Sequence, residues 1–158
     1  MNKKIWHMIR LFFCENGYSR AKYLKKNNVL GSIGNNCFWY PRRLPSEAGS
    51  VYLHNNVFVT ADVVFVTHDI TAAMLNNING KKYKSIFGKI EILDNVEIGT
   101  GSIILPNIVI GPNVIVAAGS IVTKSFSGGK DGVVIGGNPA RVIHSWGSIK
   151  EKSLVYKE

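Results

Sequence analysis

The sequence predicts an all-β solenoid, a parallel β-helix wound into three-sided coils, and three columns of residues with a period of six predict it. The first column is β-branched throughout: Ile92, Ile98, Ile104, Ile110, Val116 and Val122. The second column, three residues further on, holds only Asn or Gly: Asn95, Gly101, Asn107, Asn113 and Gly119. The third column follows directly and is small or branched: Val96, Ser102, Ile108, Val114 and Ser120. Three columns that agree in one frame make a chance pattern a poor explanation.

A period of six has a physical reason in this architecture. A short strand and a tight bend form one side of a triangular prism, so residues of successive coils stack at intervals of about 18 positions. The aliphatic column points inward, and Asn or Gly serve the bends, where a left-handed backbone disfavours most side chains. The frame therefore predicts Ile92 over Ile110, Ile98 over Val116 and Ile104 over Val122. An α-helix is excluded, because 3.6 residues per turn would carry such positions around its cylinder.

The length of 158 residues suits a single domain. The period is also present earlier, at Val51, Val57 and Val63, and continues weakly backwards through Pro45, Trp39 and Ile33. Between the two periodic stretches lies a polar, basic and non-periodic segment that we interpret as a loop ejected from the coil. The predicted divisions are an N-terminal helical cap (1–28), first coils (29–68), the ejected loop (69–88), closing coils (89–124) and a C-terminal turn and tail (125–158).

The N-terminal stretch predicts an amphipathic helix, because five apolar residues share one helical face: Ile5, Met8, Ile9, Phe12 and Phe13. Two interpretations stay open, of which the first is favoured: a cap over the end of the core, or a basic helix on an anionic membrane. His7 and Arg10 interrupt the apolar run and no cleavage site follows, so we expect neither a signal peptide nor a membrane span. A cytoplasmic location is expected, with Cys14 and Cys37 reduced.

The formal net charge of +9, from 19 Lys and Arg against 10 Asp and Glu, favours an anionic partner. The basic residues gather mostly at the two ends of the chain and in the ejected loop. No nucleic-acid-binding motif accompanies them, so nucleic acid is not an expected partner.

Four segments resemble bacterial sugar and polysaccharide O-acetyltransferases of the hexapeptide-repeat class. They are SRAKYLKKNNVLGSIGNN (19–36), VFVTHD (64–69), the repeat ending in VTK (90–124) and GGNPARVI (136–143). The last two together resemble the maltose, galactoside and Nod-factor branch and its capsular and exopolysaccharide relatives. The resemblance implies a left-handed winding, a homotrimer, and acetyl-CoA in the groove between neighbouring prisms, with no metal.

The same resemblance assigns residues. It implies that His68 is the catalytic base, and that five residues line the cofactor: Thr100, Ala118, Thr123, Lys124 and Arg141. The chain departs from the pattern in three places, with Glu97 in place of an aromatic residue, His144 in place of a second basic residue, and a longer turn, SFSGGKDG, after VTK.

Acetyl transfer to a hydroxyl needs a base, and histidine suits this role because its unperturbed pKa lies near neutral pH. Asp69 either orients the His68 imidazole or only begins the turn. On the acceptor side, Lys82 and Tyr83 in the ejected loop, with Lys81 and Lys84, suit an acidic sugar, although lysines also simply keep an exposed loop soluble.

The acceptor that we favour is a saccharide hydroxyl in a surface glycan. Two alternatives are N-acetylation of an amino-sugar nucleotide and acetylation of a streptogramin-type antibiotic. A zinc site of the carbonic anhydrase type is disfavoured, because the four histidines (His7, His54, His68 and His144) include no pair five residues apart. A silent scaffold is disfavoured by His68 at the loop and by the closing motif.

Overall fold

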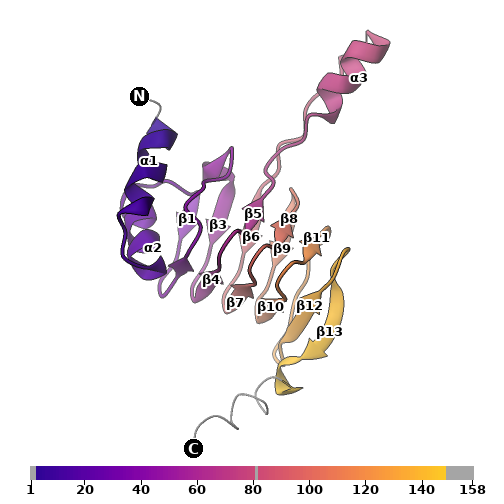
Figure 1. Ribbon diagram of the computed structural model, residues 1–158. Helices are drawn as coiled ribbons and strands as arrows, with labels where there is room; N and C mark the ends of the chain where they lie inside the picture. Colours follow the sequence, from indigo (N-terminus) through magenta and orange to yellow (C-terminus); the bar gives the residue numbers. More distant parts are fainter. Residues whose placement is uncertain (1–2, 81, 149–158) are drawn as a thin grey trace, which may run out of the picture.

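The computed structural model describes residues 3–80 and 82–148, which form three sheets visited by the chain in rotation (Figure 1). Sheet A contains β1 (Ser32–Ile33), β3 (Val51–Leu53), β6 (Ile90–Ile92) and β9 (Ile108–Ile110). Sheet B contains β2 (Phe38–Trp39), β4 (Val57–Val59), β7 (Val96–Ile98), β10 (Val114–Val116), β12 (Val133–Gly136) and β13 (Arg141–Ser145). Sheet C contains β5 (Val64–Phe65), β8 (Ile103–Ile104) and β11 (Ile121–Val122). All described pairings within the sheets are parallel except that of β12 with β13.

The strand registers confirm the predicted stacking. Ile92 pairs with Ile110, Ile98 with Val116, and Ile104 with Val122, one pair in each sheet. Every residue of the first column is at most 1% exposed, and the whole third column is buried as well. The core is therefore a column of branched side chains enclosed by three short parallel sheets.

The bends also follow the prediction. All five residues of the second column have positive φ, from 59° at Asn95 to 71° at Gly101. Where Asn occupies the bend its amide forms a ladder: Asn56 Nδ2 donates to Asn95 Oδ1 (2.8 Å), and Asn95 Nδ2 donates to Asn113 Oδ1 (2.9 Å). The Asn side chains thus connect successive coils at the corner between sheets A and B.

The first coil is larger and lacks a strand in sheet C. Its registers, Ile33 with Leu53 and Phe38 with Phe58, are 20 residues apart, which explains why the period weakens there. After β2 the chain runs through residues 40–47 into a 3₁₀ helix, Ala48–Ser50. Trp39 is fully buried, and its ring stacks on Phe65 of β5 with the centroids 5.6 Å apart. The irregular segment therefore closes the first coil with side chains and without a third strand.

Two helices, α1 (Lys3–Phe12) and α2 (Gly17–Lys26), cover the first coil (Figure 1). The side chain of Asn16 caps α2 by accepting a hydrogen bond from the Ser19 backbone N–H. Arg20 is 1% exposed and donates to the carbonyls of Leu11, Cys14 and Tyr40, so that it fastens both helices to the coil. Cys14 and Cys37 are both free thiols.

The predicted packing face of α1 is wrong. The buried residues of α1 are His7 and Leu11, and His7 Nδ1 lies 2.8 Å from the hydroxyl of Tyr23 on α2. The predicted inner stripe is exposed at four of its five positions, and only Met8 is partly buried against the core: Ile5 is 46% exposed, Ile9 40%, Phe12 65% and Phe13 80%. The helix has apolar residues on both faces, so periodicity alone did not indicate which face packs on the core.

Residues 69–88 leave the coil between β5 and β6, and their helix α3 (Thr71–Asn79) projects away from the body (Figure 1). We call this segment the arm. At its base Gly88 N donates to Thr67 O (2.8 Å), and His68 forms an antiparallel bridge with Phe87. The sequence did not predict α3. Lys81 and residues 149–158 lie outside the described residues, and the division of the chain into parts stays a prediction.

No helix in the described part of the chain is long and apolar enough to cross a bilayer.

Candidate active site

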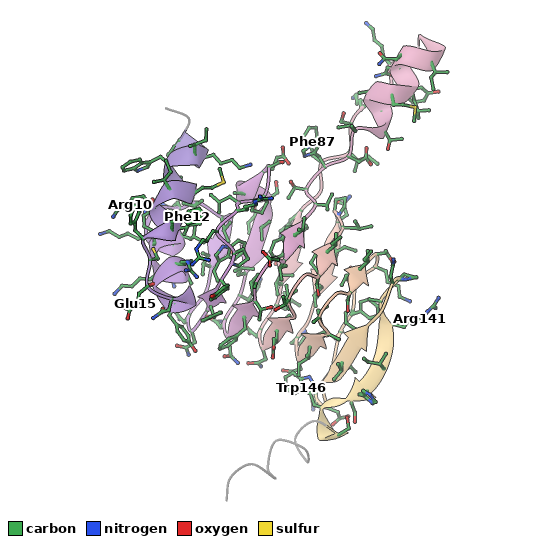
Figure 2. All side chains as sticks on the ribbon, viewed as in Figure 1. Arg10, Phe12, Glu15, Phe87, Arg141 and Trp146 are labelled. Atoms are coloured by element: carbon green, nitrogen blue, oxygen red, sulfur yellow. The ribbon has the colours of Figure 1, made fainter. Side chains whose placement is uncertain are left out.

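His68 lies at the base of the arm, where the chain leaves sheet C. The preceding residue, Thr67, is 2% exposed, and both the bridge to Phe87 and the hydrogen bond from Gly88 hold the backbone around it. The Phe87 ring lies 5.8 Å from the imidazole, centroid to centroid. Figure 2 shows Phe87 at this base. The fold therefore fixes the position of His68 although about a third of its side chain is exposed.

Glu47, from the irregular part of the first coil, contacts His68. Its Oε2 lies 2.8 Å from His68 Nδ1 and accepts a second hydrogen bond from the Thr67 hydroxyl at 2.5 Å. Thr67 Oγ1 in turn accepts from the backbone N–H of Glu47 (3.3 Å). The Thr67 hydrogen bond, joined by that of His68, lowers the pKa of Glu47 against the opposing effect of burial. The carboxylate is therefore ionised and fixed at neutral pH.

This arrangement has the chemistry that a general base requires. A carboxylate that accepts a hydrogen bond from Nδ1–H selects the neutral tautomer whose lone pair is on Nε2. Within residues 3–80 and 82–148, Nε2 has no hydrogen-bond partner, which leaves it available to an acceptor hydroxyl. Of the two roles left open for Asp69, the structure shows the turn, because its Oδ1 accepts from the backbone N–H of Thr71 (3.1 Å).

A second His–Glu pair provides a comparison. His54 Nε2 lies 2.9 Å from Glu91 Oε1, and Lys89 Nζ lies 2.7 Å from the other oxygen of Glu91. This pair lies beside sheet A, where His54 follows β3 and Glu91 is in β6. Among the described residues no group of three or more His, Cys, Asp or Glu could hold a metal ion.

The five cofactor candidates are all exposed, and the structure divides them between the two edges of sheet C. Thr100 and Ala118 stack at the corner between sheets B and C, where Gly119 N donates to Thr100 O (2.8 Å). Arg141 directly follows the turn 137–140, which is bonded to the same corner. Ile121 N donates to Gly137 O (3.0 Å), and Ala140 N donates to Ile121 O (2.8 Å). We call these three residues the B–C row.

Thr123 and Lys124 follow β11 at the opposite corner, between sheets C and A, the corner from which His68 emerges two coils earlier. Lys124 Nζ lies 5.5 Å from the centre of the Phe126 ring. We call His68, Thr123 and Lys124 the C–A row. In one copy of the chain the width of sheet C separates the two rows.

Sequence reasoning missed a groove beside the first coil. A hollow of about 480 Å³ lies between Phe12, residues 40–43 and residues 61–64, and a second of about 250 Å³ lies between residues 43–46 and 63–65. The two share Arg43, Val63 and Val64 and end at Ser46, next to Glu47. We call them together the first-coil groove. The six-residue period reaches the segment 40–47 only weakly, at Pro45, and gave no indication that this segment forms one wall of the groove and carries Glu47.

Two arginines line the first-coil groove. The Arg42 guanidinium lies over the rings of Phe12 (5.4 Å) and Tyr40 (5.8 Å), and its Nε is buried without a hydrogen-bond partner among the described residues. Arg43 is exposed in both hollows. The groove therefore offers two cations and aromatic surface, with the carboxylate of Asp62 on the opposite wall, and its other end reaches Ser46 beside Glu47.

The candidates Lys82 and Tyr83 lie on the arm, away from its base. Tyr83 N donates to Asn76 Oδ1 (2.6 Å) and Asn76 Nδ2 donates to Tyr83 O (3.1 Å), and these two bonds fasten the returning segment of the arm to α3. Both side chains are exposed. The structure does not bring them next to His68 of the same chain (Figure 1).

The comparisons with known proteins agree with this architecture. The model of the family described as bacterial transferase hexapeptide (six repeats) matches residues 89–124. Over 127 residues the chain is 41% identical to Protein CapG of Staphylococcus aureus, a match that covers 77% of this chain and 70% of that protein.

Two solved structures resemble the whole coil. A maltose O-acetyltransferase from Clostridium difficile 630 is 25% identical with a TM-score of 0.62, over 90% of this chain and 86% of that chain. The hexapeptide-repeat acetyltransferase VCA0836 from Vibrio cholerae, also solved with acetyl coenzyme A, shares the fold with a TM-score of 0.69 at 19% identity, over 90% of this chain and 88% of that chain. The repeat, the coil that it forms and the CapG match together show that this chain belongs to the hexapeptide-repeat acetyltransferase family and is an acyltransferase.

Proposed function

We propose that this protein transfers the acetyl group of acetyl-CoA to a hydroxyl of a saccharide, in the synthesis of a surface polysaccharide. The observation that carries the proposal is the His68–Glu47 pair at the base of the arm, in which Nε2 of His68 bonds to no other described residue. The similarity to a maltose O-acetyltransferase supports a sugar acceptor, and the acetyl coenzyme A complex of VCA0836 supports the acetyl donor.

In the proposed reaction His68 Nε2 removes the proton of the acceptor hydroxyl as its oxygen attacks the thioester carbonyl. The new C–O bond forms, the C–S bond breaks, and the imidazolium returns the proton to the departing thiolate. Glu47 stabilises the positive charge on the ring during these steps and keeps Nε2 directed outward. Glu47 is a positioning residue, because it acts through His68 and does not touch the substrates.

The proposal includes a homotrimer of left-handed coils. The B–C row and the C–A row lie on opposite edges of sheet C, so a single copy presents neither a closed groove nor a complete set of contacts. Copies placed side by side would bring the B–C row of one against the C–A row of the next. Lys124 and Arg141 would then meet the phosphates of one coenzyme from two sides.

On the acceptor side, the proposal places the sugar in the first-coil groove beside Glu47 and His68. Arg42, Arg43 and the aromatic rings there would bind an acidic sugar or a sugar pyrophosphate. Lys82 and Tyr83 would contribute from the arm of the neighbouring copy, since their own arm carries them away from the body.

The experiment is a coenzyme-release screen of the purified protein with acetyl-CoA and a panel of neutral sugars, uronic acids, repeat-unit oligosaccharides, amino-sugar nucleotides and a streptogramin. We expect turnover with a hydroxyl acceptor, reduced by roughly 10²–10⁴-fold in His68→Ala. His54→Ala is the matched control, because it removes the histidine of the other His–Glu pair and should keep wild-type turnover. A drop of equal size in the two variants would refute the role of His68, and turnover only with amino acceptors would refute O-acetylation.

A further inference from the structure

The outward face of α1 is apolar and exposed. Opposite the buried His7 and Leu11, the helix and the residue after it present Ile5 (46% exposed), Trp6 (46%), Ile9 (40%) and Phe13 (80%) to solvent. Residues 5, 9 and 13 fall at intervals of four and therefore lie along one line of the helix surface. Removing this face from water would be favourable, so its exposure indicates a binding surface.

Basic residues border the face. Lys3 and Arg10 lie on the side of α1 next to Trp6, and α1 contains no acidic residue. Arg10 and Phe12 both project from α1 in Figure 2. Across α1 and α2, residues 3–26 contain seven Lys or Arg against one acidic residue, Glu15. These 24 residues thus supply most of the formal +9 of the whole chain.

Charge distinguishes the two occupants that could cover an apolar face of this size. A second copy that packed the same face of its α1 here would bring its own Lys3 and Arg10 against this basic border, which disfavours that contact. An anionic lipid surface would neutralise the same border while its acyl region receives the apolar side chains. Trp6 adds a residue type that prefers the boundary between headgroups and acyl chains.

We propose that α1 docks this protein on an anionic membrane surface, with Ile5, Trp6, Ile9 and Phe13 inserted among the lipids and Lys3 and Arg10 at the headgroups. The helix lies in the plane of the surface, since its inner face stays packed on the coil through His7 and Leu11. The binding is reversible and weakens with salt, because part of it is electrostatic.

The test is sedimentation of the purified protein with vesicles, measured without acetyl-CoA so that it is independent of the proposed acetyl transfer. We expect binding to vesicles of equal parts phosphatidylcholine and phosphatidylglycerol, and much weaker binding to phosphatidylcholine alone. The triple substitution Trp6→Ser, Ile9→Ser and Phe13→Ser should weaken binding by at least about tenfold. The substitutions Lys3→Gln and Arg10→Gln should weaken binding to the anionic vesicles and reduce its salt dependence.

The matched control replaces three other exposed apolar residues, on the arm, Ile70→Ser, Ile78→Ser and Ile86→Ser, and should leave vesicle binding unchanged. Circular dichroism checks that each variant is folded. The proposal is overturned if the wild-type protein stays in the supernatant with anionic vesicles, or if the arm control loses as much binding as the α1 variant. It is also overturned if the α1 substitutions change the oligomeric state in light scattering and leave vesicle binding intact, because the face then belongs to a second copy.

Discussion

At the scale of single residues, Glu47 shows how the fold supplies a partner that the motif around His68 lacks. It lies 21 residues before His68 in the sequence and contacts it only because the first coil replaces a strand with an irregular segment. The motif indicated His68 and left Asp69 either to orient the imidazole or to begin the turn, and the structure places the Asp69 carboxylate on the backbone N–H of Thr71. A residue held by tertiary structure in a non-periodic stretch leaves no local signal in a single sequence.

The pair leads to a prediction for Glu47→Gln. The neutral amide cannot stabilise the imidazolium, so we expect kcat to fall by roughly 10- to 1,000-fold while the KM for acetyl-CoA stays within error. Steady-state kinetics with a fixed acceptor measure both values. Glu91→Gln, in the other His–Glu pair, is the control and should change neither. A parallel rise in the KM for acetyl-CoA would indicate a general disturbance of the site and contradict a positioning role.

The cofactor residues lead to a second prediction. Lys124→Gln and Arg141→Gln should each raise the KM for acetyl-CoA by roughly tenfold, because each removes one charged contact with a phosphate. If one of the two side chains binds the ribose phosphate, the rise in KM caused by its substitution should be smaller with a coenzyme that lacks this phosphate. Lys130→Gln, an exposed cation in the turn after β11, is the control. If Lys130→Gln matched the other two variants, general charge rather than specific contacts would explain the effect.

At the scale of elements, periodicity predicted what repeats and failed where the chain does not repeat. The closing coils, their inward column and their left-handed bends all follow from the sequence. The irregular segment 40–47, helix α3 and the antiparallel β13 have no period of six and depend on tertiary contacts. For α1 the period was present but ambiguous, since both of its faces carry apolar side chains.

The bends lead to a stability prediction. Gly101 has φ of 71° with open space where a Cβ would lie, so Gly101→Ala is penalised by backbone conformation and not by a clash. We expect a loss of about 1 kcal/mol in the free energy of unfolding. Gly49→Ala is the matched control, because Gly49 has equally open space without a positive φ, and should change stability little. Urea denaturation measures both, and equal losses would mean that the left-handed bend is not what requires glycine.

The helical cap leads to a prediction on pH. Burial, with a smaller effect from Lys3, lowers the pKa of His7 below its ordinary value of 6.5. As the pH falls below 6.5, His7 is therefore protonated more readily in the unfolded chain than in the folded chain. The free energy of unfolding decreases over this range as a result. The lowered pKa values of Glu47 and Glu91 affect stability in a separate pH range, because the stability that these carboxylates contribute is lost only below about pH 4.5.

Urea denaturation between pH 7 and pH 5 tests this prediction. His7→Gln keeps a hydrogen-bonding partner for Tyr23 and removes the titrating group, so the variant should lose less stability over this range than the wild-type protein. Identical slopes for the two proteins would show that His7 does not contribute to the acid sensitivity.

At the scale of the whole molecule, the position of the two rows on opposite edges of sheet C predicts complementation between two variants that are each defective in a different row. In a mixed trimer of His68→Ala and Arg141→Ala chains, some grooves would combine the intact His68 of one copy with the intact Arg141 of its neighbour. We expect activity at low acetyl-CoA to be higher when the two variants are unfolded and refolded together than the average of the two variants refolded alone. No recovery in mixtures that light scattering shows to be reassembled trimers would place both rows in the same copy's site.

The C-terminal segment limits the length of the coil. A stack of parallel strands ends in three open edges, each able to pair with another chain. Here the last parallel strand of each sheet is covered: β13 runs antiparallel along β12 of sheet B, Phe126 bridges to β9 of sheet A, and the turn 137–140 bonds to β11 of sheet C. At the opposite end α2 contacts both β1 and β2. The long turn SFSGGKDG, the turn 137–140 and β13 thus together remove the parallel edges on which a further coil of this or another chain would stack.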